Sequence, residues 1–107
     1  MDKRVINRVK KRVMVKYGTD KADKTGFTKN LSVTGICIKT NNVMKPVTTL
    51  QVDLKFTDRE ISLWARVVWA KKVPAQLAHV LDCGMGLHFI DPPEEWADYF
   101  SRWERGE

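Results

Sequence analysis

Cysteine, histidine and long apolar runs are all scarce in this chain of 107 residues. Its two cysteines, Cys37 and Cys83, are too few for a disulfide framework and suit a reducing compartment. No apolar run approaches the roughly 18 residues that a membrane-spanning helix needs. The basic N-terminus is not followed by an apolar stretch, so a secretory signal is not expected. We therefore expect a cytoplasmic protein with a single domain, since a chain of this length can bury one core without disulfides.

The residue groups that catalysis and metal binding require are also missing. No serine has a histidine or an aspartate at a recognisable catalytic spacing. His79, Cys83 and His88 match no common metal-ligand spacing, so we interpret them as ordinary strand residues. Gly84 and Gly86 open an apolar strand and not a helix, which argues against a glycine-rich phosphate loop. The sequence therefore predicts neither an enzyme nor a metal site.

Positive charge is abundant and lies almost entirely in the first quarter of the chain. The net charge is +6. Residues 1–29 contain ten Lys or Arg and three Asp, a balance of +7, whereas residues 30–107 contain nine basic and ten acidic residues, a balance of −1. Such a basic segment attracts anions: a nucleotide, a nucleic acid or an anionic membrane. A solvated basic tail without a partner would have the same composition.

Alternating apolar residues predict a series of short strands. In residues 12–17, Val13, Val15 and Tyr17 share one face of a half-buried strand. In residues 61–70 the alternation places Trp69 on one face and Trp64 on the other. The remaining strands are expected over residues 25–31, 36–40, 47–56, 78–83 and 84–90. Six or seven short strands with frequent turns favour a small antiparallel β-barrel or a sandwich.

The C-terminus changes from a strand period to a helix period. Asp91 is expected to cap a helix whose first turn contains two prolines and two glutamates. The aromatic residues of this segment fall on one face of the helix; they are Trp96, Tyr99, Phe100 and Trp103. We expect this face to pack against the barrel. A partner protein or a dimer interface is the alternative.

Three arginines stand four residues apart near the N-terminus. Arg4, Arg8 and Arg12 can share one face of either a helix or a strand, so their guanidiniums can converge. Arginine is the side chain best suited to bidentate phosphate contacts and to stacking on planar bases. This spacing therefore predicts a binding site for an anion that carries phosphate.

A polar corner follows at Asn30, Ser32 and Gly35. Asn30 and Ser32 are two residues apart, so their side chains point to one face if the chain is extended. Gly35 tolerates a positive φ, which suits a strand that kinks and starts again. The same residue types are also typical of turn capping, so this corner alone has two interpretations.

Together, Arg8-x-x-x-Arg12 and Asn30-x-Ser32-x-x-Gly35 resemble the motif pair of the PilZ domain, the bacterial receptor module for cyclic di-GMP. Residues 65–69 (ARVVW) and 84–89 (GMGLHF) resemble that family's late strands, so the resemblance covers nearly the whole chain. It implies one domain that is a six- or seven-stranded antiparallel β-barrel with a C-terminal helix. Its parts would be a basic arm (1–11), the barrel (12–90) and the helix (91–105).

The resemblance also implies roles for individual residues. Arg8 and Arg12, with Arg4 on the same face, would grip phosphate and the O6/N7 edge of guanine. Asn30 and Ser32 would hydrogen-bond the guanine, and Gly35 would let the backbone approach it closely. Two tryptophans compete as a stacking platform for the base, Trp69 and Trp64, and either could instead belong to the core.

Two positions depart from the common pattern of that family. Asn7 stands where many members carry a further arginine, and Asn30 stands where many carry aspartate. The resemblance still implies a receptor without catalysis. Binding of cyclic di-GMP would order the basic arm, and this change would signal to a downstream protein partner. Two alternatives remain: a PilZ-like adaptor that works through protein contacts alone, and a small basic barrel that binds nucleic acid, which the scarcity of aromatics in a row disfavours.

Overall fold

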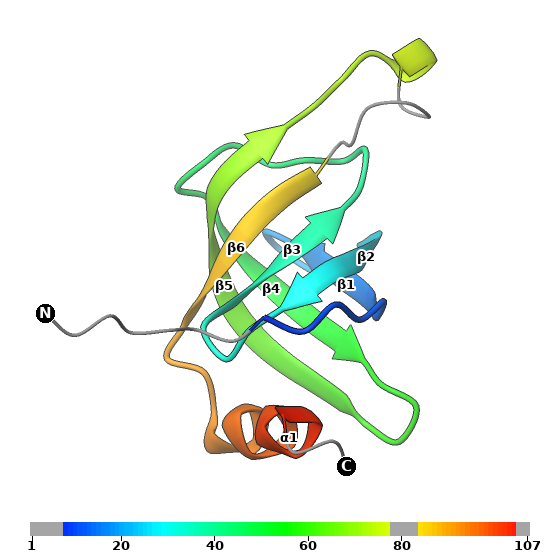
Figure 1. Cartoon of the computed structure of the whole chain (residues 1–107). Helices are drawn as coiled ribbons and strands as arrows, with labels where there is room; N and C mark the ends of the chain where they lie inside the picture. Colours follow the sequence, from blue (N-terminus) through cyan, green and yellow to red (C-terminus); the bar gives the residue numbers. More distant parts are fainter. Residues whose placement is uncertain (1–7, 78–83, 105–107) are drawn as a thin grey trace, which may run out of the picture.

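Six antiparallel strands close into a barrel in the computed structural model, which describes residues 8–77 and 84–104. The strands are β1 (Met14–Gly18), β2 (Lys24–Leu31), β3 (Gly35–Lys39), β4 (Thr49–Lys55), β5 (Glu60–Lys71) and β6 (Gly84–Ile90). They neighbour one another in the order β1-β2-β3-β6-β5-β4, and β4 pairs with β1 (Figure 1). A short 3-10 turn η1 (Ala75–Leu77) follows β5, and helix α1 (Glu94–Glu104) follows β6. The predicted barrel with a C-terminal helix is confirmed; the strand expected over 78–83 lies outside the described residues.

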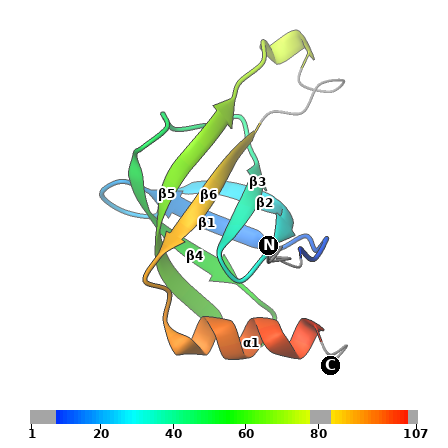
Figure 2. The same ribbon diagram turned by 60° about the vertical axis from the view of Figure 1, so that its left-hand side comes forward.

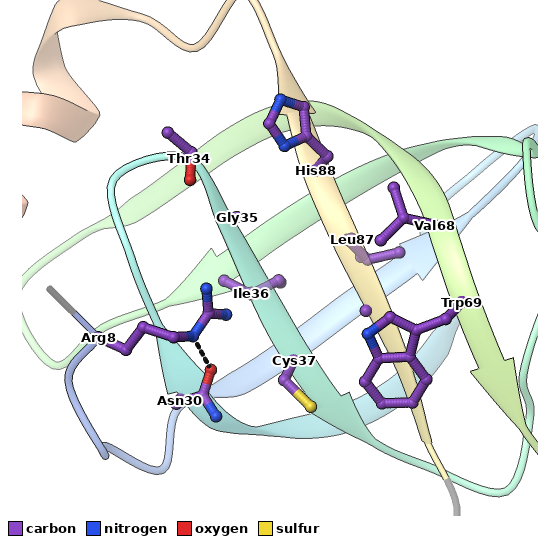
Figure 3. A pocket seen from close by; sticks show the side chains of 11 residues that line it. Arg8, Asn30, Thr34, Gly35, Ile36, Cys37, Val68, Trp69, Leu87 and His88 are labelled. Carbon is purple, nitrogen blue, oxygen red and sulfur yellow. Dashed lines mark hydrogen bonds between the residues drawn. The ribbon is translucent and has the colours of Figure 1, made fainter. Parts of the chain in front are cut away.

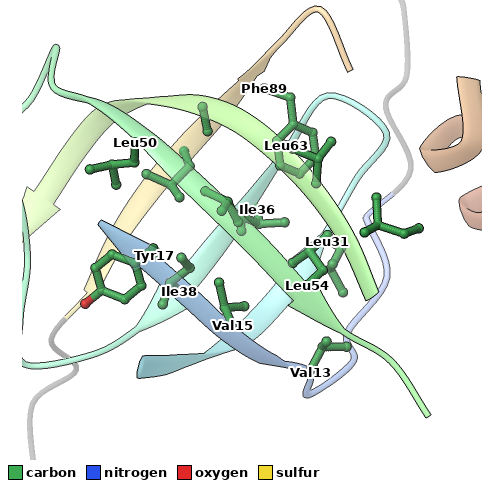
Figure 4. Close-up of a cluster of buried hydrophobic side chains, with 14 of the residues drawn as sticks. Val13, Val15, Tyr17, Leu31, Ile36, Ile38, Leu50, Leu54, Leu63 and Phe89 are labelled. Atoms are coloured by element: carbon green, nitrogen blue, oxygen red, sulfur yellow. The ribbon is translucent and has the colours of Figure 1, made fainter. Parts of the chain in front are cut away.

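The alternation of apolar residues places one face of each strand inside the barrel (Figure 4). Val13, Val15 and Tyr17 are all buried, as the sequence predicts. The buried residues of the other strands continue this pattern; they include Leu31, Ile36, Ile38, Leu50, Val52, Leu54, Ile61, Leu63, Ala65, Val67, Met85, Leu87 and Phe89. Burial of these side chains is the main force that closes the sheet.

Helix α1 lies across one open end of the barrel (Figures 1 and 2) and buries Trp96, Tyr99 and Phe100 there, while the side chain of Trp103 lies outside the described part of the structure. Trp96 is fully buried, and its ring centroid lies 6.2 Å from that of Phe56 and 5.5 Å from that of Phe89. Tyr99 and Phe100 are buried beside it. The helix therefore acts as a plug for the barrel, which confirms the preferred of the two expectations.

The predicted N-cap of this helix is wrong. The helix begins at Glu94, and the backbone N–H of Trp96 donates to the carbonyl of Pro93 at 3.0 Å. Asp91 lies three residues before the helix and has a positive φ of 44°. Two consecutive prolines separate Asp91 from the helix, so the carboxylate stands too early to cap it. Glu94 and Glu95 do occupy the first turn, where the helix dipole favours negative charge.

Two irregularities in the strand pairing decide which side chains face outward. The register of β2 against β3 shifts between Thr28 and Asn30, and the register of β5 against β6 shifts between Val67 and Trp69. An extra residue in one strand reverses the faces of those that follow it. The predicted placement of Trp69 on the face of Ile61 and Val67 is therefore wrong. Trp69 is 47% exposed on the outside of the barrel.

Candidate functional site

The segment that precedes β1 is held along the edge of β2, and this contact positions Arg8. Val9 and Leu31 exchange two backbone hydrogen bonds, of 2.7 and 2.9 Å. Farther along, the backbone N–H of Val13 donates to the hydroxyl of Thr28 at 2.9 Å. Residues 9–13 therefore run beside β2 in the opposite direction.

Arg8 meets the polar corner at the end of β2. Its Nε donates to Oδ1 of Asn30 at 2.7 Å (Figure 3), and its Nη1 donates to Oγ of Ser32 at 3.4 Å. The first contact is short and exposed, and the second is long and partly buried. The structure thus brings Arg8 to Asn30 and Ser32, although Arg8 is more than twenty residues from either of them in sequence.

Asn30 and Ser32 do not share one face as an extended chain would require. β2 ends at Leu31, and Ser32 is completely buried in the turn that follows. Its Oγ accepts hydrogen bonds from the backbone N–H groups of Gly35 at 3.1 Å and Thr34 at 3.3 Å. Ser32 therefore caps the turn between β2 and β3. Its role is to shape the corner beneath Arg8, whereas the Asn30 side chain lies on the outer surface.

Gly35 is needed for space and not for a positive φ. Its backbone does not adopt the left-handed conformation. A Cβ at this position would instead collide with the backbone carbonyl oxygen of Leu87 on β6. The expectation of a positive φ at this corner is therefore wrong. The glycine allows β3 and β6 to pair closely where the corner meets the sheet.

A shallow groove of about 300 Å³ begins beside Arg8 and crosses the outside of β3 and β6 to reach β5. Cross-strand pairing sets one row of residues along it: Asn30 on β2 pairs with Cys37, Cys37 with Gly86, and Gly86 with Trp69. Because Gly86 has no side chain, the indole of Trp69 can lie directly over it and close the far side of the groove. The other residues that line the groove are Arg8, Thr34, Gly35, Ile36, Val68, Leu87 and His88.

Arg12 lies apart from this groove. Its guanidinium carbon is 3.9 Å from the centre of the Phe27 ring, a cation–π contact on the outer face of β2. Arg12 therefore does not converge with Arg8 on Asn30 in this conformation. Arg4 lies outside the described residues.

The two competing tryptophans both lie outside the core, on different parts of β5. Trp64 is 49% exposed and lines a separate hollow with Gln51, Asp53 and Ser62. Trp69 faces the groove that starts at Arg8. Of the two, Trp69 is the one that the structure brings together with Arg8 and Asn30.

Seven of the residues that line the groove were not singled out as site residues from the sequence, and three of these lie on its central rows: Cys37, Gly86 and His88. Cys37 could have been found, because the alternation in residues 36–40 points it away from the buried Ile36 and Ile38. Gly86 and His88 could not, because their place beside Trp69 and Gly35 depends on the pairing of strands distant in sequence. Across 8–77 and 84–104, no three His, Cys, Asp or Glu side chains gather as metal ligands, and no helix is long and apolar enough to span a membrane.

Comparison with known proteins gives a family and a fold. The family model of the PilZ domain matches residues 2–101. No match was found among curated proteins. A solved structure with similar architecture is that of the Bacillus subtilis inhibitor of motility (MotI/DgrA), with a TM-score of 0.76 and 14% identity over the full length of this chain.

A second similar structure is the PilZ domain of CeSA from a cellulose-synthesizing bacterium. It has a TM-score of 0.63 and 15% identity, and the match covers 94% of this chain and 96% of that one. In contrast, the chain spans 54% of the length of the inhibitor of motility. At these identities, both neighbours support the fold alone.

Proposed function

The chain belongs to the PilZ domain family, and we propose that it is a receptor for cyclic di-GMP that has no catalytic activity of its own. PilZ domains are binding and regulatory modules rather than enzymes. The observation that carries the proposal is the bond between Arg8 and Asn30 at the rim of a groove whose far wall is Trp69. A cation, an amide and an aromatic ring along one groove suit a ligand that carries phosphates and purine bases.

Each residue of this set matches one part of the ligand. The free N–H groups of the Arg8 guanidinium would bind a phosphate or the O6/N7 edge of a guanine. The amide of Asn30 would hydrogen-bond the guanine beside it. The indole of Trp69 would stack on a base, as exposed aromatics do in many proteins that bind nucleotides. Ser32 and Gly35 would contribute indirectly, because they shape the corner that holds Arg8 and Asn30.

Arg12 would join the site only after a local rearrangement. Its guanidinium would leave the ring of Phe27 and turn toward the ligand, and Arg4 would approach with the basic arm. Ligand binding would then order the arm, because only the ordered arm supplies all the arginines to the phosphates. Amide hydrogen exchange of residues 3–7 should slow when cyclic di-GMP is added, whereas the amide of Val9, which already bonds to Leu31, should change little. If the arm is already protected without ligand, the ordering mechanism is wrong even if binding stands.

Ordering of the arm would signal to a downstream protein. A module without catalysis can act only by changing the surface that it offers to a partner. One structural neighbour is itself named as an inhibitor of motility, which agrees with a regulatory role for this fold. Because cyclic di-GMP is an intracellular second messenger of bacteria, the protein would act in the cytoplasm.

Isothermal titration with cyclic di-GMP tests the binding proposal. We expect saturable binding by the wild type and about a tenfold or greater loss for Arg8→Gln, since a charge-assisted hydrogen bond contributes about 1.5–3 kcal/mol. Lys21→Gln is the matched control, because it removes the same charge from the exposed turn before β2. A single-stranded DNA oligonucleotide tests the nucleic-acid alternative. Absence of binding to cyclic di-GMP at high micromolar concentration would refute the proposal.

A further inference from the structure

We propose that Arg66 and His88 form a second anion subsite, which binds the phosphate of the ligand that Arg8 does not contact. The proposal rests on the function proposed above and adds residues that neither motif of the sequence contains. Both residues project from the outer face of the barrel, Arg66 from β5 and His88 from β6.

Strand register places the two side chains next to each other and next to the groove. Arg66 pairs with His88 across β5 and β6, and His88 pairs with Gly35 across β6 and β3. This row lies two residues along β6 from the row of Cys37, Gly86 and Trp69, a distance of about 6.6 Å. His88 itself lines the groove (Figure 3). The subsite is therefore continuous with the site at Arg8.

The surroundings of Arg66 contain no compensating negative charge. Its cross-strand neighbours are Thr49 on β4 and His88 on β6. Its neighbours on the same face of β5 are Trp64 and Val68. Within residues 8–77 and 84–104, neither Arg66 nor His88 forms an ion pair or a side-chain hydrogen bond.

Two cations at the β4–β5 hairpin, in contrast, are paired with carboxylates. Nζ of Lys55 lies 2.7 Å from Oε1 of Glu60, its direct cross-strand partner. Nη1 of Arg59 lies 3.4 Å from Oε2 of Glu95 on α1. Arg66 has no such partner among the described residues, and its cross-strand neighbour His88 places an imidazole beside it. An anion bound between Arg66 and His88 could accept hydrogen bonds from both side chains, which is why we assign the pair to a ligand.

The position of the pair fits a ligand with two separated phosphates. Asn30, which holds Arg8, lies on β2, and Arg66 lies on β5, with β3 and β6 between them. Three strand spacings separate these positions, about 14 Å across the sheet. The long side chains of Arg8 and Arg66 can reach from these two ends toward the middle of the groove. A cyclic dinucleotide can present one phosphate to each end, whereas a mononucleotide can reach one end only.

Isothermal titration with cyclic di-GMP on single variants tests the subsite. We expect Arg66→Gln to weaken binding about tenfold and His88→Val to weaken it several-fold, because each removes a donor to the second phosphate. Arg66→Lys and His88→Lys restore a cation and should recover most of the affinity. Both positions are exposed, so the thermal unfolding midpoint should change little in all four variants.

The controls separate this subsite from diffuse electrostatics and from the function itself. Lys21→Gln should bind as the wild type does, and an equal loss for this variant would overturn the subsite. If Arg66→Gln and His88→Val bind normally while Arg8→Gln does not, the subsite is wrong and the receptor function stands. If the wild type does not bind cyclic di-GMP, both proposals fail together.

Discussion

The barrel has two polar regions that use charge in opposite ways. Where α1 meets the β4–β5 hairpin, the hydroxyl of Tyr99 donates to Oδ1 of Asp58 at 2.7 Å, and Arg59 lies between Asp58 and Glu95. We name this region the helix–hairpin contact. On the groove side, Arg66 and His88 stand without an acidic neighbour among the described residues. The charged side chains of the helix–hairpin contact are paired with one another, whereas Arg66 beside the groove is available to a ligand.

The two regions are joined at the turn between β2 and β3. Nε1 of Trp96, in the buried face of α1, donates to the carbonyl of Val33 at 3.1 Å. Val33 lies in the same turn as Ser32, whose hydroxyl accepts a hydrogen bond from Arg8. The helix thus supports the corner of the groove from below. This link allows the comparison to be tested by substitutions on each side.

Trp96→Ala should have the largest effect, and it should fall on stability. Trp96 is fully buried among Phe56, Phe89 and Phe100, so its removal leaves a cavity at the end of the barrel. We expect the free energy of unfolding to fall by about 3–5 kcal/mol, measured by chemical denaturation. Trp96→Phe should lose clearly less, because it keeps a ring in the same place. A loss below about 1 kcal/mol for the alanine variant would show that the helix does not plug the barrel.

Trp69→Ala should have the opposite profile, with an effect on binding and little on stability. Its indole is half exposed over Gly86, and stacking on a base contributes about 1–3 kcal/mol. We expect affinity for cyclic di-GMP to fall about tenfold in isothermal titration. Trp64→Ala is the matched control, since Trp64 is equally exposed on the same strand but faces another hollow. Equal losses for the two variants would contradict the assignment of Trp69 to the site.

Two glycines on the outer face of β6 should respond differently to the same small change. A Cβ at Gly86 would meet the indole of Trp69, which can move, so Gly86→Ala should weaken binding a few-fold and leave stability nearly unchanged. A Cβ at Gly84 would meet the backbone carbonyl of Ile38, which cannot move freely. Gly84→Ala should therefore lower the unfolding free energy by about 1–3 kcal/mol. Denaturation and titration of both variants would detect a reversal of this pattern. Such a reversal would contradict the placement of a movable indole over Gly86.

Asp58→Asn should have the smallest effect, visible in its pH dependence. The hydrogen bond from Tyr99 holds the pKa of Asp58 below its usual value, with help from Arg59 and Arg102. A carboxyl whose pKa is lowered by folding stabilises the fold above its ordinary pKa, and this contribution is lost as pH falls through the folded-state pKa. The unfolding midpoint of the wild type should thus exceed that of the variant near pH 7. The difference should shrink as the pH falls through the lowered pKa of Asp58, and a difference that is constant with pH would argue against the charged contact.

Local patterns in the sequence were enough to predict the barrel strands and the helix. Val13, Val15 and Tyr17 alternate and are buried, and Trp96 and Phe100 share a helical face and are buried. The resemblance to a known motif pair implied that Arg8 and Asn30 contact the same ligand, but their direct hydrogen bond was not predicted. It could not have come from periodicity, because the two residues are brought together by the pairing of Val9 with Leu31.

Other parts of the site could not be predicted in this way. Alternation placed Trp69 inside the barrel, and the shift in register after Val67 turns it outward. Ser32 was expected beside Asn30 on one face, and the end of β2 at Leu31 buries it instead. Arg12 was expected beside Arg8, and the ring of Phe27 holds it elsewhere in this conformation. Each outcome depends on a contact with a residue distant in sequence.

The sequence by itself determined most of the residues that face the core, because side chains alternate along a strand and recur every three or four residues along a helix. The tertiary structure decided which outward-facing residues meet. Gly86, Trp69 and His88 meet at one groove, with Arg66 beside His88, because β5 and β6 pair in a particular register with one extra residue. That register is fixed by the packing of the whole closed sheet, and no local pattern in either strand contains it.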